Sequence, residues 1–265
     1  MYEVQYHRPA SLEDAQKLIA GAEDPKLLAG GQTLLPTMKQ HLAAPSDLVD
    51  IRKIDGMAGI TREGDSFRIG AAATHAEVAG HAELRAAIPS LARLAAGIGD
   101  PAVRHMGTIG GSLANNDPAA DYPSAVLALN ATVITDKREI AADDFFQGMF
   151  TTALDEGEII TAIRVSTPKR GAYAKFPNPA SRYAMTGVYV AETGAGVRVA
   201  VTGAGENGVF RHEAMESALA SNFAPEALDG IDTPADGLLS DIHGSAAYRA
   251  QLIKVMAKRA VAAAD

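Results

Sequence analysis

Two pairs of adjacent glycines are the parts of the sequence best suited to hold a ligand. Residues 30–33 read Gly-Gly-Gln-Thr, and residues 110–112 read Gly-Gly-Ser. Glycine lets the backbone approach a ligand closely and adopt a positive φ. Successive backbone N–H groups in such turns bind anions, and a nearby hydroxyl adds a further donor. The two segments therefore have the residue types needed to hold the two halves of a pyrophosphate.

Either glycine pair taken alone is more typical of an ordinary tight turn. The second pair, however, lies within residues 99–121, which are rich in Gly, Asn, Asp and Pro and are expected to form one long loop. Loops of that length inside a compact domain usually carry function. The two pairs together with this segment favour nucleotide binding over two unrelated turns.

Two other segments match catalytic patterns but have the wrong context. Residues 203–208 match the G-x-G-x-x-G pattern of dinucleotide-binding proteins, yet no strand follows the helix expected after them, so we expect a structural turn. Residues 110–114 differ by one position from the G-x-S-x-G turn of hydrolases, yet no buried strand precedes them. The histidines show no metal-binding spacing. We therefore predict neither a catalytic residue nor a metal site.

The surrounding elements are short strands and helices, identified from their apolar periodicity and capping residues. We expect strands at residues 4–6, 27–29, 48–51, 67–73, 132–135, 139–141, 159–165, 186–191 and 197–202. We expect helices after Ser11 and at residues 33–40, 89–98, 121–129, 210–220, 225–228 and 245–264, with Asp121 capping the fourth. The pattern changes after Pro168. It predicts a domain of residues 1–170, with lobes of about 1–55 and 56–170, and a domain of residues 171–265.

The composition excludes several classes of function. Lys and Arg number 24 against 32 Asp and Glu, a net charge of −8 without a basic cluster, so nucleic acid is not expected as a partner. Cysteine is absent, which excludes disulfides, cysteine nucleophiles and iron–sulfur clusters held by this chain. No apolar stretch approaches the roughly 20 residues that span a bilayer, and no signal peptide is visible. We therefore expect a cytoplasmic protein.

The glycine segments resemble the paired flavin motifs of the FAD-binding medium subunits of molybdenum hydroxylases, the family of xanthine dehydrogenase and aerobic carbon monoxide dehydrogenase. The family patterns run A-G-G-x-S-L and T-I-G-G-S/N-L-A, followed by D-P-A-A-D-x-P; the matching residues here are 29–34, 108–114 and 117–123. Residues 98–107, 157–163 and 241–249 are similar too, so the resemblance covers nearly the whole chain. Residues 175–182 and the tail from residue 210 look most like carbon monoxide dehydrogenase medium chains.

The resemblance implies an α+β fold with FAD as cofactor. A two-lobed FAD-binding domain of the vanillyl-alcohol oxidase (PCMH) type would be followed by a small α+β C-terminal domain with an antiparallel sheet and helices. The implied phosphate-binding residues are Ala29, Gly30, Gly31, Gln32 and Thr33 in the first segment and Thr108, Gly110, Gly111 and Ser112 in the second. Asp121 would meet the ribose or adenine side, Ile98 and Ile160 would be apolar neighbours, and Lys175 would lie near the flavin.

The chain departs from the family pattern in two places. Gln32-Thr33 replaces the more usual His or Thr before Ser, and residues 176–183 replace a commoner basic run after Lys175. A solvated surface lysine is the alternative at Lys175. Tyr173 and Tyr183 could approach the ring, but core or interface positions are the alternative for both.

The resemblance also implies an oxidoreductase subunit that transfers electrons. Small [2Fe–2S] and large molybdenum-cofactor subunits would be its partners, in a dimer of heterotrimers. FAD would collect electrons from the clusters and pass them to an acceptor such as a quinone or NAD, during oxidation of carbon monoxide or of a purine or aromatic substrate. Two alternatives remain: a non-catalytic scaffold with the same fold and no FAD, and a free-standing flavin oxidase.

Overall fold

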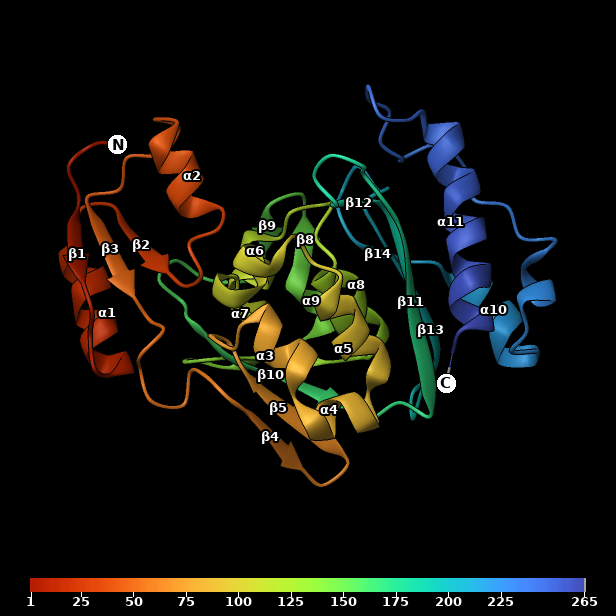
Figure 1. Ribbon diagram of the computed structural model, residues 1–265, viewed down its shortest axis with the longest axis horizontal. Coiled ribbons are helices and arrows are strands. Elements are labelled where there is room, and N and C mark those ends of the chain that lie inside the picture. The colour runs from red at the N-terminus through yellow and green to blue at the C-terminus, as the bar shows by residue number, and fades with distance from the viewer. Residues whose placement is uncertain (265) are drawn as a thin grey trace.

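A small parallel sheet forms the first lobe of the protein, which the computed structural model describes over residues 1–264 (Figure 1). The lobe consists of β1 (Gln5–His7), α1 (Leu12–Gly21), β2 (Pro25–Leu28), α2 (Leu34–Lys39) and β3 (Asp47–Asp50). The strand order is β1-β3-β2. Ser11 begins α1 by accepting a hydrogen bond from the Asp14 N–H at 3.1 Å, as the capping pattern predicts.

An antiparallel sheet of order β4-β5-β10-β6-β7 forms the second lobe. Its strands are β4 (Ile60–Glu63), β5 (Ser66–Gly70), β6 (Thr132–Thr135), β7 (Glu139–Ala141) and β10 (Ile160–Ser166), with a separate pair β8 (Phe146–Gly148) and β9 (Thr151–Thr152). Its helices are α3 (His75–Gly80), α4 (Ala82–Ala87), α5 (Pro89–Ala96), α6 (Pro101–Met106), α7 (Ile109–Asn115), α8 (Tyr122–Ala128) and α9 (Ala142–Phe145).

The third sheet is antiparallel, of order β11-β12-β13-β14, and is covered by helices on both faces (Figure 1). It comprises β11 (Arg170–Pro177), β12 (Ala184–Thr193), β13 (Gly196–Thr202) and β14 (Phe210–Arg211), followed by α10 (Glu213–Ser221), a 3₁₀ turn η1 (Pro225–Leu228) and α11 (Ala246–Ala262). Helices α10 and α11 contact one face, and α5 and α8 contact the other. The predicted α+β class is confirmed.

Strand β12 shows why this sheet belongs to two cores. Side chains alternate between the faces of a strand. Val188 and Val190 pack in the core under α10 and α11, whereas Tyr189 and Ala191 pack in the core of the second lobe. The predicted boundary after residue 170 falls at the start of β11, whose first residue is Arg170. It stays a prediction, because the third sheet shares its inner core with the preceding lobe.

Residues 99–121 differ from the predicted loop, because they contain helices α6 and α7. Asp100 starts α6 by accepting from the Val103 N–H at 2.9 Å, and Thr108 starts α7 by accepting from the Gly111 N–H at 3.1 Å. Helices this short show too few turns for an apolar period to be recognised. The predicted cap at α8 is also wrong, since the Asp121 side chain makes no capping hydrogen bond.

The C-terminal region adds two further differences. Strand β11 was not expected from the sequence, and the helix expected from Phe210 begins at Glu213, after β14. The structural turn predicted for residues 203–208 is confirmed, because it joins the antiparallel strands β13 and β14. Gly203 has φ +80°, and a Cβ there would lie 2.3 Å from the Ala184 carbonyl oxygen. Only glycine fits this turn without strain.

Candidate functional site

A cavity of about 610 Å³ lies between the first and second lobes. Its walls come from Ile51 and from within residues 26–37, 71–121 and 154–160, and residues 181–183 of the β11–β12 connection also line it. Cavities that hold cofactors and small ligands are typically about 300–1,000 Å³. The space is therefore of the size that a dinucleotide cofactor needs.

The structure brings nearly all the predicted site residues to this cavity. Those that line it are Ala29, Gly30, Gly31, Gln32, Thr33, Ile98, Thr108, Gly110, Gly111, Ser112, Asp121 and Ile160. Lys175 is not among the lining residues. The two glycine segments, about 80 positions apart in the chain, form one wall because a Cβ on Gly30 would lie only 2.6 Å from the Gly107 Cα.

The first glycine segment offers free backbone donors. It connects β2 to α2, and Gly31 has φ +68°. Within residues 1–264, the backbone N–H groups of residues 30–34 donate to no protein acceptor. Of these residues Gly30 is buried while Gln32 and Thr33 are exposed, and successive N–H groups without an internal acceptor at the edge of a cavity are available to an anionic ligand. This segment fits the phosphate groups of a nucleotide.

The second glycine segment differs from the sequence expectation, because its backbone N–H groups are already bonded within the protein. The N–H groups of Ile109 and Gly110 donate to the carbonyls of Ala73 and Ala71, and those of Gly111 and Ser112 donate to Thr108. They are therefore not free to bind an anion. Gly110 is needed for packing, because a Cβ there would lie 2.6 Å from the Ala71 Cβ. The Ser112 hydroxyl has no hydrogen-bond partner among the residues described, and it is the donor that this wall can offer.

Asp121 reaches the cavity from a buried ion pair. Its Oδ1 lies 2.9 Å from the Lys175 Nζ and accepts from the Tyr173 hydroxyl at 2.6 Å. Burial raises the pKa of Asp121, and the charge of Lys175 opposes that rise. The surface alternative for Lys175 is wrong, because its side chain is 12% exposed. Tyr173 packs against the second-lobe core, whereas Tyr183 lines the cavity.

His75 is a lining residue that the sequence did not indicate. It is the first residue of α3, follows the capping Thr74, and is buried. Burial, together with the nearby charge of Arg104, lowers the pKa of His75 to about 4, so the ring is neutral. Its Nε2 would lie 2.5 Å from a Cβ on Gly107, which explains the glycine there. Thr74 and Glu77 form a capping box at the start of α3, but that pattern carries no signal of burial.

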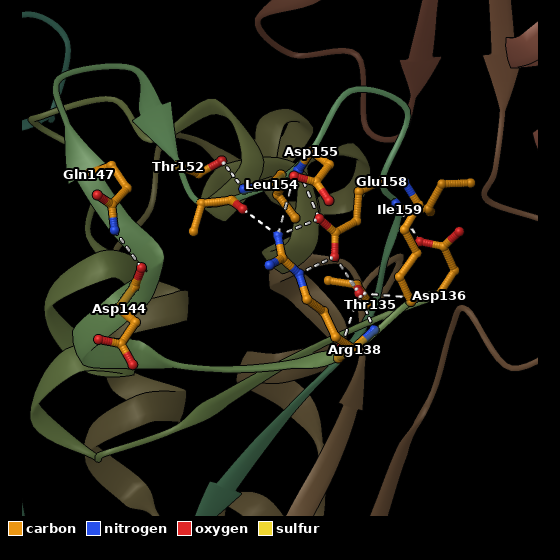
Figure 2. Close-up of polar contacts among 12 residues, drawn as sticks. Thr135, Asp136, Arg138, Asp144, Gln147, Thr152, Leu154, Asp155, Glu158 and Ile159 are labelled. Atoms are coloured by element: carbon orange, nitrogen blue, oxygen red, sulfur yellow. Dashed lines mark hydrogen bonds and ion pairs between the residues drawn. The ribbon is translucent and has the colours of Figure 1, made fainter.

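Glu158 closes the edge of the cavity through a network of polar contacts, shown in Figure 2. Arg138 donates to both of its carboxylate oxygens, at 3.0 and 2.9 Å. The Thr135 hydroxyl donates to Oε1 at 2.7 Å, and the Asp155 N–H donates to Oε2 at 2.8 Å. The hydrogen bond from Arg138, more than any other contact, lowers the pKa of Glu158 to about 2.

Replacing Glu158 by Gln is expected to lower the free energy of unfolding by about 1.5–3 kcal/mol at neutral pH, because charge-assisted hydrogen bonds are lost. The folded-state pKa lies below the unfolded one, so this contribution is present above the unfolded value and disappears as pH falls through about 2. Urea unfolding of both proteins across acid pH measures it. A difference that does not shrink in acid contradicts the assignment.

The fold and the cavity together define a class of protein: an α+β protein whose lobes form a cavity of the size of a dinucleotide cofactor. The family model of the FAD-binding domain in molybdopterin dehydrogenase matches residues 2–168. The chain belongs to this family, the FAD-binding subunits of molybdenum hydroxylases. Its cofactor is FAD, it is an oxidoreductase subunit, and its FAD-binding domain is of the PCMH type, as the sequence predicts.

Similar proteins cover nearly the whole length of the chain. It is 35% identical to the nicotine 6-hydroxylase medium subunit of Paenarthrobacter nicotinovorans, over 97% of this chain and 96% of that one. It is 36% identical to the carbon monoxide dehydrogenase medium chain of Afipia carboxidovorans, over 97% and 94%. The solved carbon monoxide dehydrogenase from Oligotropha carboxidovorans matches with a TM-score of 0.89 and 35% identity, covering 98% and 97%. None of the helices in residues 1–264 is long and apolar enough to cross a membrane.

Proposed function

We propose that the chain is the electron-transfer subunit of a molybdenum hydroxylase complex. A small partner chain with [2Fe–2S] clusters supplies the electrons, and an external acceptor such as a quinone or NAD takes them away. The observation that carries this proposal is the FAD-sized cavity with free N–H groups at residues 30–34. The chain has no cysteine, so any thiolate-held cluster that feeds this site belongs to another chain.

The lining residues have distinct roles in this proposal. When bound, FAD supplies a ring that accepts and releases electrons. The free N–H groups of the first glycine segment hold a phosphate, and the Ser112 hydroxyl donates from the adjacent second segment. Ile98 and Ile160 exclude water from the cofactor, and Asp121 accepts from a sugar hydroxyl. Lys175 acts through Asp121, whose charge it balances.

The complex around this chain follows from its relatives. Their names describe medium chains or subunits of dehydrogenases and hydroxylases that act on compounds as different as nicotine and carbon monoxide. We therefore assign the choice of substrate, either carbon monoxide or a purine or aromatic compound, to a large molybdenum-containing partner. A cytoplasmic dimer of heterotrimers stays the expected assembly.

The test is to purify the chain together with the proteins that bind it and to record the visible spectrum. A two-banded flavin spectrum, FAD released by acid at about one per chain, and iron and molybdenum in co-purifying chains support the proposal. A colourless complex that takes up no added FAD supports the scaffold alternative and contradicts it. A yellow chain that purifies alone and reduces oxygen directly with a substrate supports the free-standing oxidase and also contradicts it.

A further inference from the structure

One wall of the FAD cavity is a short irregular segment that has no regular structure of its own. Residues 117–121 connect α7 to α8, and Asp117, Ala120 and Asp121 line the cavity. Within the segment, the Asp117 carboxylate accepts from the Ala119 N–H at 2.8 Å. The position of this wall therefore depends on the hydrogen bonds that its other backbone groups make with the rest of the protein.

The third sheet holds the carbonyl groups of this wall. The buried Thr202 hydroxyl lies 2.6 Å from the Ala120 carbonyl oxygen and 3.1 Å from that of Pro118. The Gly203 N–H donates to the same Pro118 carbonyl at 2.8 Å. A hydroxyl has one proton to donate, so the shorter contact to Ala120 is the main bond.

The same sheet also holds the carboxylate at the end of the wall. Tyr173 and Lys175 of β11 bind Asp121 at 2.6 and 2.9 Å. The segment is thus fixed at its carbonyls by the end of β13 and at its last side chain by β11. The residues of β11 and of the end of β13 that make these contacts all lie beyond residue 168, at which the family model of the FAD-binding domain ends.

The end of β13 is itself supported from the far face of the sheet. Arg249 of α11 is buried and donates to the carbonyls of Met185 and Gly203. Its Nη2 donates to the Asp241 carboxylate at 2.8 Å. Gly203 cannot shift freely, because its left-handed backbone packs on the Ala184 carbonyl. The support for Thr202 is therefore rigid.

We propose that Thr202 is a positioning residue of the FAD site, which holds the wall of residues 118–121 against the cofactor although it does not line the cavity. The inference rests on the proposed placement of FAD in this cavity. It makes the third sheet a part of the FAD site, so the matched domain of residues 2–168 does not carry the complete site.

The test compares Thr202→Val with Thr202→Ser in the full chain, after removal and titration of FAD. The Val variant keeps the shape but loses the hydroxyl, and its FAD dissociation constant is expected to rise about tenfold, as for one lost hydrogen bond. The Ser variant keeps the hydroxyl and is expected to bind within about twofold of the original chain. The visible circular dichroism of bound FAD should change in the Val variant and not in the Ser variant.

Each outcome decides the question. Equal FAD affinity in the Val variant overturns the proposal, and so does a Ser variant as weak as Val, because packing rather than the hydroxyl then matters. If the Val variant fails to fold, Thr202→Ala replaces it; Ala and Ser both lack the methyl group and differ only in the hydroxyl, so equal affinity of that pair overturns the proposal. An original chain that binds no FAD contradicts the placement of the cofactor instead.

Discussion

Replacing Gly30 by Ala is expected to abolish stable FAD binding, with the dissociation constant rising about 100-fold or more, which corresponds to about 2.8 kcal/mol. A Cβ at this position would lie 2.3 Å from the Met106 carbonyl oxygen and 2.6 Å from the Gly107 Cα. Both atoms belong to backbone, so no side chain can turn away. The backbone at Gly30 and the backbone at residues 106–107 must move apart instead.

The displaced atoms belong to the part of the chain that binds the cofactor. Gly30 begins the row of free N–H groups, and Gly107 precedes the N-cap of α7. Overpacking of this kind typically costs about 1–3 kcal/mol in folding, so the variant is expected to fold with a lowered Tm. The loss of FAD comes in addition, because the N–H groups then point away from the phosphate.

Gly80→Ala is the matched control. This glycine ends α3, and a Cβ there meets no atom within 4 Å. The FAD affinity of the Gly80→Ala variant should equal that of the original chain. Its free energy of unfolding should rise slightly, because alanine is more favourable than glycine in a helix. Flavin fluorescence titration and thermal unfolding distinguish the variants. Unchanged FAD affinity in the Gly30 variant would show that the contact between the two glycine segments is not part of the site.

The glycine segments that line the cavity are recognisable in the sequence because they have a local signature, and their role toward FAD stays a prediction. Positions such as Gly31 and Gly203 need glycine for reasons of backbone geometry that a pattern records. Their functions are less visible. Gly31 and Gly110 look alike in sequence, yet the N–H groups at residues 30–34 are free and those at residues 109–112 are bonded within the fold.

Long-range contacts account for what the sequence missed. Thr202 lies in an ordinary apolar strand, and nothing near it in the chain indicates that its hydroxyl meets Ala120, 82 residues away. The burial of His75 and of Lys175 is not visible in the sequence for the same reason, because elements far along the chain cover these side chains. Periodicity gives the face of an element, but not the partner that covers it.

Replacing Lys175 by Met is expected to lower the free energy of unfolding by about 3–5 kcal/mol at neutral pH, since it leaves the Asp121 carboxylate buried without its cation. Asp121 is 5% exposed, and the Tyr173 hydroxyl then remains its hydrogen-bond donor. Lys169→Met is the control, because Lys169 is 72% exposed and pairs with Glu192 at 2.9 Å. That exposed pair should contribute about 0–1 kcal/mol.

The pH dependence of the Lys175 variant distinguishes lost charge pairing from lost packing. Burial already raises the pKa of Asp121 in the folded chain, and removing Lys175 removes the main opposing charge, so the pKa rises further. A carboxyl with a raised folded-state pKa takes up a proton on folding, so stability increases as pH falls through that pKa. The deficit measured by urea unfolding should therefore shrink as pH is lowered from neutral toward the ordinary carboxyl pKa. A deficit that stays constant over this range means that Lys175 contributes through its aliphatic stem or through its 3.1 Å hydrogen bond to the Gly97 carbonyl and not through its pairing with Asp121, because neither contact depends on the protonation of Asp121.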